Sequence, residues 1–117
     1  MTHNFPKIIH QIWFDFKDLP NIPEHFNKNV ESWKNHNPDW DYKVWDLETA
    51  VKIIKDEYPG YLNTFNEFKY NISKCDFFRY ILMNKYGGMY IDLDFLCIRP
   101  INYFLDLLLK IISSIMP

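Results

Sequence analysis

Two aspartates, Asp92 and Asp94, end a short apolar segment that follows a pair of glycines. Side chains alternate between the faces of an extended strand, so Tyr90, Asp92 and Asp94 are expected on one face. The opposite, core-facing side is expected to hold Met89, Ile91, Leu93 and Phe95. Two carboxylates this close repel each other unless a cation lies beside them. Mg²⁺ and Mn²⁺ take oxygen ligands and complete their shells with water and substrate phosphates. The pattern therefore predicts a divalent metal site that accepts a diphosphate.

The spacing of these aspartates is a weak signal by itself, because short motifs also arise by chance. The chain contains a second Asp-x-Asp pair, Asp39 and Asp41, in a polar segment after Pro38. We interpret this second pair as turn residues exposed to solvent. The position of Asp92 and Asp94 behind an apolar strand distinguishes them.

A second pair of charges, Asp76 and Arg79, precedes the glycines and lies on one face of a predicted helix. Its plain interpretation is a local ion pair, worth roughly a few tenths of a kcal/mol. The flanking residues are apolar, however, and a charged pair there is costly unless it faces a polar cleft. A guanidinium also suits recognition of phosphate or sugar oxygens. Both interpretations stay open on the sequence alone.

Three segments have the pattern of strands. Residues 6–14 and 41–46 are short and rich in β-branched and aromatic types, and residues 89–98 follow the double glycine. Parallel strands of an open α/β sheet bind ligands at their carboxyl ends. The end of the third strand is therefore the expected place for the aspartates.

Helices are expected between and after these strands, and the strongest covers residues 72–86, with Ser73 as its N-cap. Gly87 and Gly88 should end that helix in a left-handed cap. The other expected helices run from Pro23 to before Asn37, over residues 47–58, briefly within 61–70, and from Asn102 onward. The alternation of strands and helices predicts an α/β fold with a largely parallel sheet.

The composition is that of a globular domain, with 48% hydrophobic and 19% aromatic residues among 117. We expect one domain, residues 1–117. The formal charge of −2 argues against a protein that mainly neutralises nucleic-acid phosphates. Cys75 and Cys97 are expected to be buried, reduced thiols.

Neither end of the chain has the pattern of a signal peptide or membrane span. The N-terminus lacks a basic region before an apolar run. Residues 104–116 are apolar but contain Asp106 and Lys110, and they fall short of the ~20 residues that a span needs. The resulting expectation is a cytoplasmic protein without a transmembrane segment.

Three stretches together, PKIIHQIWF, NPDWDYKVWD and SKCDFFRYILMNKYGGMYIDLDFLCIRP, resemble the glycosyltransferases with a DXD sugar-binding region. This family includes the initiating α-1,6-mannosyltransferases and the inositol phosphorylceramide mannosyltransferases, and it is related to glucosylating toxin domains. The resemblance implies a GT-A, Rossmann-like fold. It also implies metal-dependent transfer, with retention, of a hexosyl group from a UDP- or GDP-sugar.

The resemblance further implies which residues bind the donor. Trp13 would stack on the nucleotide base, with His10 and Gln11 nearby, although Trp13 also fits a plain core position. Asp76 and Arg79 would contact the hydroxyls of the sugar.

The resemblance assigns the chemistry to residues at and before the aspartate pair. Tyr90 would lie near the ribose or phosphates. Asp92 would hold ribose, sugar or a metal-bound water, and Asp94 would ligate Mn²⁺ or Mg²⁺ directly. With Arg79, the two aspartates form the predicted catalytic set.

Members of this family continue well beyond the aspartate pair, whereas this sequence ends at Pro117. We therefore expect an N-terminal donor-binding portion without the acceptor-binding portion. The acceptor, which could be a glycan, a lipid or a protein, is then not identified by this sequence. An exposed sheet edge would favour oligomers. The alternative is an inactive remnant that binds nucleotide-sugar or acts as an interaction module.

Overall fold

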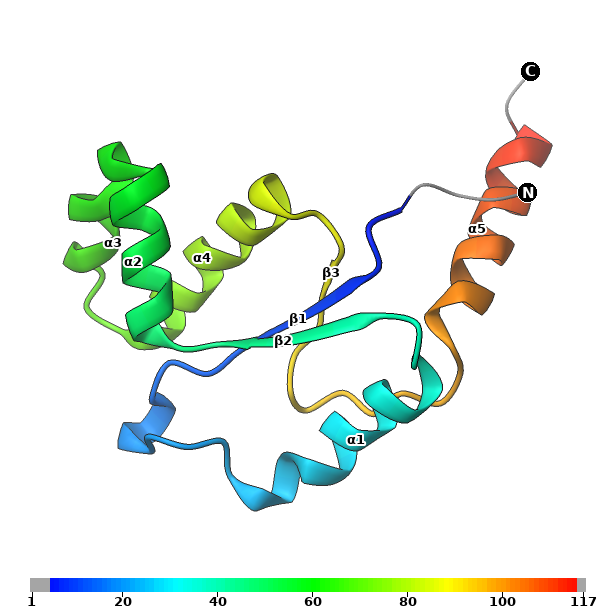
Figure 1. Cartoon of the computed structure of the whole chain (residues 1–117), viewed down its shortest axis with the longest axis horizontal. Helices are drawn as coiled ribbons and strands as arrows, with labels where there is room; N and C mark the ends of the chain where they lie inside the picture. The colour runs from blue at the N-terminus through cyan, green and yellow to red at the C-terminus, as the bar shows by residue number, and fades with distance from the viewer. Residues whose placement is uncertain (1–4, 116–117) are drawn as a thin grey trace.

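The computed structural model of the chain describes residues 5–115, so the ends of the predicted 1–117 domain lie outside the described residues. Three parallel strands form its sheet (Figure 1), in the order β2-β1-β3. The central strand β1 (Ile8–Ile12) pairs along its whole length with β2 (Asp41–Trp45). It pairs with β3 (Met89–Tyr90) at only two positions. The predicted parallel α/β architecture is confirmed.

Residues 5–115 also form five α-helices (Figure 1). Their bounds are Asn27–His36 for α1, Leu47–Glu57 for α2, Leu62–Glu67 for α3, Asn71–Lys85 for α4 and Ile101–Ile115 for α5. Figure 1 shows α2, α3 and α4 grouped together, with α1 apart from them and α5 at the far end of the molecule. Short 3₁₀ turns precede α1 and α3, at Glu24–Phe26 and Pro59–Tyr61.

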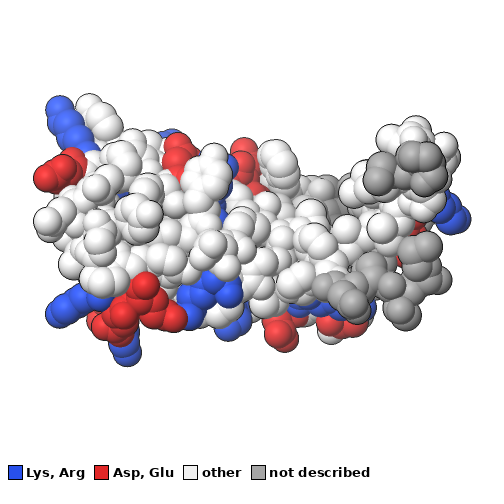
Figure 2. All heavy atoms as spheres, turned by 90° about the horizontal axis from the view of Figure 1, so that it is seen from above, with Lys and Arg blue, Asp and Glu red and all other residues white. Residues whose placement is uncertain are grey.

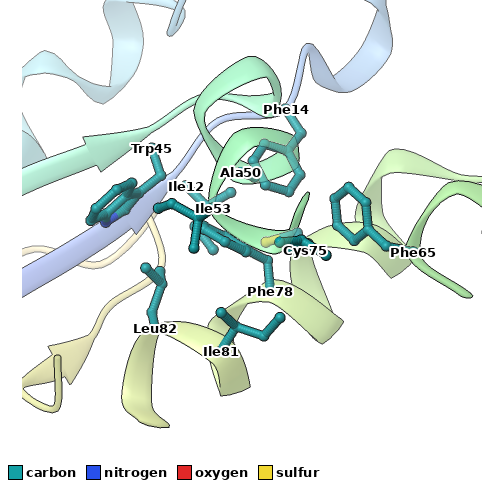
Figure 3. Packing of buried hydrophobic residues seen from close by; sticks show 11 residues of the cluster. Ile12, Phe14, Trp45, Ala50, Ile53, Phe65, Cys75, Phe78, Ile81 and Leu82 are labelled. Carbon is teal, nitrogen blue, oxygen red and sulfur yellow. The ribbon is translucent and has the colours of Figure 1, made fainter. Parts of the chain in front are cut away.

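Strand β1 is buried on both faces, as expected for the centre of a parallel sheet. On one face Ile12 belongs to a large cluster contributed by β2, α2, α3 and α4, in which Phe14 and Phe78 are fully buried. Figure 3 shows these side chains converging between the sheet and the helices. On the other face Ile9 packs in a smaller cluster with Trp40 and Ile101.

Helix α4 begins and ends at sites that fix the strand after it. The helix starts at Asn71 with Tyr70 as its N-cap residue, so the predicted N-cap role of Ser73 is wrong. Its end is as predicted, because Gly87 and Gly88 both have positive φ, 69° and 88°. A Cβ on Gly88 would overlap the carbonyl oxygen of Ile8, so the glycine lets the chain enter the sheet beside β1.

The third strand is much shorter than predicted, since residues 89–98 were expected to be extended and only two of them form β3. The last backbone hydrogen bond between this segment and β1 runs from the Ile91 amide to the His10 carbonyl, at 3.0 Å. The chain then turns at Leu93 and Asp94, and the Phe95 amide closes the turn onto the Asp92 carbonyl at 3.2 Å.

The surface of the described residues has charges of both signs. Figure 2 shows Lys, Arg, Asp and Glu side chains interspersed around one face, without a large patch of either sign. Helix α5 exposes several large apolar side chains, including Leu108, which is 53% exposed. No helix within residues 5–115 has both the length and the apolar character needed to cross a bilayer. Strands β2 and β3 form the edges of the sheet, and oligomerisation through an edge stays a prediction.

Candidate functional site

A cavity of about 360 Å³ opens where the carboxyl ends of β1 and β3 meet α4. Six of the eight sequence-predicted site residues line it: Trp13, Asp76, Arg79, Tyr90, Asp92 and Asp94. These residues come from three separate stretches of the sequence. Parallel strands place ligands at this end of an α/β sheet, so the fold and the residue pattern indicate the same place.

The two aspartates reach the cavity from the segment that follows β3, Asp92 just before the turn and Asp94 within it. Ile91 and Leu93 between them are buried, 5% and 7% exposed, although Leu93 also contributes to the cavity wall. Asp92 and Asp94 are exposed and both line the cavity. The predicted alternation therefore holds up to Asp94. It fails at Phe95, which was expected in the core and is 56% exposed, because the turn at Leu93 and Asp94 reverses the chain.

The Arg79 guanidinium is paired at one end and unpartnered at the other. Its Nη2 donates to Asp76 Oδ1, one helical turn away. Partial burial works against its charge, but the hydrogen bond and the charge of Asp76 outweigh burial and raise the pKa of Arg79. The Nε atom is buried without a hydrogen-bond partner among the described residues. Burying an N–H group without a hydrogen-bond partner costs free energy. The Nε atom is therefore available to donate to an acceptor that enters the cavity.

Tyr90 connects the arginine to the aspartates. The Arg79 guanidinium lies over the Tyr90 ring, 5.0 Å from its centroid, a cation–π arrangement. The phenol oxygen lies 3.5 Å from Cys75 Sγ. Burial, followed by interactions with Cys75 and then with Asp92, raises the pKa of Tyr90, so the phenol keeps its proton. Burial likewise raises the pKa of the Cys75 thiol, and both cysteines are buried as predicted.

Aromatic side chains form the wall opposite the charges. Trp13 packs edge-to-face on Phe16, with ring centroids 4.9 Å apart, and lies 6.2 Å from the Phe26 ring. Its indole Nε1 donates to the Leu19 carbonyl at 2.8 Å, and the residue is only 9% exposed. Trp13 is therefore both a packed residue and part of the cavity wall. Stacking on a nucleotide base stays a prediction.

His10 and Gln11 do not line the cavity, and both are fully buried in β1. His10 Nε2 donates to the Gly87 carbonyl at 2.9 Å, while Trp45 Nε1 donates to His10 Nδ1 at 3.0 Å. This pair of bonds needs the neutral ring, and burial lowers the pKa of His10. The ring thus connects β1 and β2 to the glycine that ends α4. The cavity lining does not match its predicted place beside a donor.

Gln11 acts on the opposite face of β1. Tyr42 donates its hydroxyl hydrogen to Gln11 Oε1, and burial, followed by the Glu31 charge, raises the pKa of that phenol to about 12. The amide nitrogen of Gln11 in turn reaches the Asp92 carbonyl at 3.5 Å. Gln11 therefore lies behind the aspartate segment and supports its backbone.

Six other residues line the cavity. Ile12 and Leu93 adjoin predicted site residues, and sequence reasoning missed the other four: Phe16, Phe26, Ile72 and Cys75. Phe16 could have been found, because it follows Trp13 by three residues in the same aromatic run. The others come from separate segments, and nothing in their local sequence indicates that they meet at this place.

The donor atoms at the cavity suit a hard divalent ion. Asp92 and Asp94 offer carboxylate oxygens, and no group of three or more His, Cys, Asp or Glu within residues 5–115 could enclose a metal. Mg²⁺ and Mn²⁺ are commonly bound through one or two carboxylates plus substrate phosphates. The site therefore fits an ion that arrives with a diphosphate.

The second Asp-x-Asp pair lies elsewhere. Asp39 accepts from Lys7 Nζ at 2.9 Å and from Asn102 Nδ2 at 3.1 Å. These hydrogen bonds lower the pKa of Asp39. The residue thus connects the start of β1 to α5, and neither Asp39 nor Asp41 lines the cavity.

Comparison with known proteins gives a consistent result. Residues 23–111 match the family described as glycosyltransferase sugar-binding region containing DXD motif. A mannosyl phosphorylinositol ceramide synthase of Saccharomyces cerevisiae is 41% identical over 97 residues, 83% of this chain and 24% of that protein. The inositol phosphoceramide mannosyltransferase 1 of Schizosaccharomyces pombe is 34% identical over 115 residues, 96% of this chain and 35% of that protein.

More distant similarity extends to an initiation-specific alpha-1,6-mannosyltransferase of Candida albicans, which is 30% identical over 101 residues, 84% of this chain and 26% of that protein. The chain thus spans about a quarter to a third of the length of these curated relatives. No solved structure matches the chain. The names of these relatives do not favour the alternative of an interaction module.

Proposed function

The chain belongs to the family of glycosyltransferase sugar-binding regions that contain a DXD motif, and on this premise we propose that it binds a nucleoside-diphosphate sugar for transfer. The observation that carries the proposal is the meeting of Asp92, Asp94 and Arg79 in one cavity with Trp13. A diphosphate needs positive charge, a sugar needs hydrogen-bonding groups, and a base needs an aromatic wall. Arg79 supplies one positive charge and a bound ion would supply the rest, the carboxylates can accept from sugar hydroxyls, and the aromatic wall includes Trp13.

Asp94 would hold Mn²⁺ or Mg²⁺ directly, and Asp92 would bind it directly or hold a water on it. When bound, the ion supplies the charge that stabilises a leaving diphosphate. Arg79 adds a fixed positive charge, and its unpartnered Nε is a free donor for a phosphate or sugar oxygen. Asp76 orients that guanidinium and has further oxygen lone pairs for sugar hydroxyls. Tyr90, which keeps its proton, offers a neutral hydroxyl beside them.

The proposal extends to the fold and to the transfer. We propose that the β2-β1-β3 sheet is the donor-binding part of a GT-A sheet and that transfer proceeds with retention. A parallel sheet with its acidic pair at the carboxyl end of a strand supports this assignment. Relatives named as mannosyltransferases make mannose the first sugar to test. Their names also make an inositol phosphoceramide the first acceptor to test with a protein of full family length.

Isothermal titration calorimetry tests donor binding. GDP-mannose and UDP-glucose are titrated into the chain with and without Mn²⁺, and then into Asp94→Asn. Binding of one donor is expected only with Mn²⁺. The Asp94→Asn variant is expected to lose more than the roughly 10–100-fold that loss of an outer partner of a metal ligand costs.

The chain supplies a matched control in its other acidic pair. Asp41→Asn makes the same chemical change at an exposed residue outside the cavity and should leave affinity unchanged. Binding of neither donor with Mn²⁺ would refute the proposal. Equal loss of affinity in the two variants would also contradict it, because it would mean that the site does not depend on Asp94.

A further inference from the structure

The backbone that carries Asp92 and Asp94 is not held by a neighbouring strand. Pairing with β1 ends at the Ile91 amide. Beyond that point, four backbone groups of residues 92–97 bond to side chains instead. Gln11 reaches the Asp92 carbonyl at 3.5 Å, Asn29 the Leu93 carbonyl at 3.0 Å, Trp33 the Phe95 carbonyl at 2.8 Å, and Ser32 the Cys97 amide at 2.8 Å.

Three of those four side chains belong to α1. Asn29, Ser32 and Trp33 have the spacing of one helix face, with neighbours three and four residues apart. This face of α1 takes the place of the missing strand, because its side chains satisfy backbone groups that a ladder would otherwise pair.

Asn29 has a special place among these partners. Its Nδ2 donates to the carbonyl of Leu93, the residue between the two aspartates. That carbonyl belongs to the peptide that joins Leu93 to Asp94, so its direction fixes how Asp94 leaves the backbone. Ser32 and Trp33 act one to three residues later, after the turn is complete. Asn29 is half-buried and lies outside the cavity.

We propose that Asn29 is a positioning residue for the Asp92–Asp94 pair, and that its hydrogen bond to the Leu93 carbonyl sets the direction of the Asp94 carboxylate. The residue does not touch the donor or the metal and acts only through the Leu93–Asp94 peptide. The binding part of this inference rests on the proposed donor function. Removing a residue that orients a metal ligand typically lowers metal affinity by about 10–100-fold.

The variant Asn29→Leu removes the amide donor while keeping a good helix former in α1. Ser32→Ala is the matched control, because it removes a bond from the same helix to the same segment, but beyond Asp94. A purely structural role predicts the same outcome for both variants. The proposal predicts different outcomes.

Amide hydrogen exchange tests positioning without any ligand. The Phe95 amide closes the turn onto Asp92, and the Ile91 amide reports the adjoining sheet. In Asn29→Leu, the Phe95 amide is expected to exchange about tenfold faster, as loss of about one hydrogen bond implies, while Ile91 is unchanged. In Ser32→Ala, both amides should exchange as in the original chain. Unchanged Phe95 exchange in Asn29→Leu, or equal acceleration at Ile91, would overturn the proposal.

Calorimetry with Mn²⁺ and the better of GDP-mannose and UDP-glucose then tests the consequence. Asn29→Leu should weaken donor affinity at least about tenfold, whereas Ser32→Ala should change it less than about twofold. Equal affinities in both variants would overturn the proposal. If the original chain binds neither donor, the proposed function fails, and the exchange experiment alone decides the role of Asn29.

Discussion

Gly88 offers a quantitative test of how the fold delivers the aspartates to the cavity. Its φ of 88° lies in the left-handed region, and it is the residue directly before β3. An alanine Cβ there would overlap the Ile8 carbonyl oxygen and lie 3.1 Å from Ile8 Cβ. The nearest obstacle is backbone, which cannot rotate away as a flexible side chain could. Gly88→Ala must therefore move β3 away from β1.

The expected cost has two parts. A left-handed backbone costs an L-residue roughly 1–2 kcal/mol. Moving β3 weakens its pairing with β1, including the Ile91–His10 hydrogen bond of 3.0 Å, at about 1 kcal/mol per bond. The sum is about 3 kcal/mol of the free energy of unfolding, a large fraction of the stability of a small domain.

Gly60→Ala is the matched control, because a Cβ on Gly60 meets nothing within 4 Å and its φ is not positive. The same substitution should stabilise the chain by about 0.4–1 kcal/mol through the unfolded state. Urea unfolding, followed by tryptophan fluorescence, measures both variants. With a slope of about 1–3 kcal/mol per M, their midpoints should differ by about 1 M or more. Equal midpoints would refute the close approach of β3 to β1.

Two further predictions concern the stability of the described fold. Because burial lowers the pKa of His10 below its ordinary 6.5, the unfolded state binds the proton more readily. The free energy of unfolding should be constant above about pH 6.5 with respect to this group and decline as the pH falls towards the folded-state pKa. Urea titrations at several pH values measure it. His10→Gln should remove this decline, and the exposed His25→Gln should keep it. Asn37 is 2% exposed and its Oδ1 accepts from the Ile101 amide at 2.7 Å. Asn37→Leu should lower the free energy of unfolding by about 2 kcal/mol. Asn35→Leu, at an exposed position, should lower it little. A loss in Asn35→Leu as large as that in Asn37→Leu would contradict this role.

The sequence was sufficient to predict the sheet, its parallel character and half of the residues in the cavity wall. Residues 6–14 and 41–46 contain the strands β1 and β2, and α4 ends at the two glycines as expected. The alternation correctly separated the exposed Asp92 and Asp94 from the buried Ile91 and Leu93. These predictions succeeded because each depends on a local pattern, a period of two or a left-handed cap, that a short stretch of sequence contains.

The failures concern partners that are distant in sequence. The pattern of residues 89–98 fits a strand, but it does not reveal that pairing with β1 ends at Ile91 and that α1 side chains bond to the backbone beyond it. The resemblance placed His10 near Trp13 and the donor, whereas alternation turns it to the opposite face of β1, where it meets Trp45. Asn29 carries no local signal, since only the fold brings it to Leu93.

The central claim is that Asp92 and Asp94, and not the chemically identical pair at 39 and 41, bind a divalent ion together with a nucleoside diphosphate. Paramagnetic broadening by Mn²⁺ in the presence of GDP or UDP, read from the amide signals of the isotope-labelled chain, compares the two pairs directly. Signals of residues 92–94 and of Arg79 should broaden at substoichiometric Mn²⁺, while those of residues 39–41 stay sharp. Equal broadening at both pairs, or broadening at residues 39–41 alone, would contradict the account.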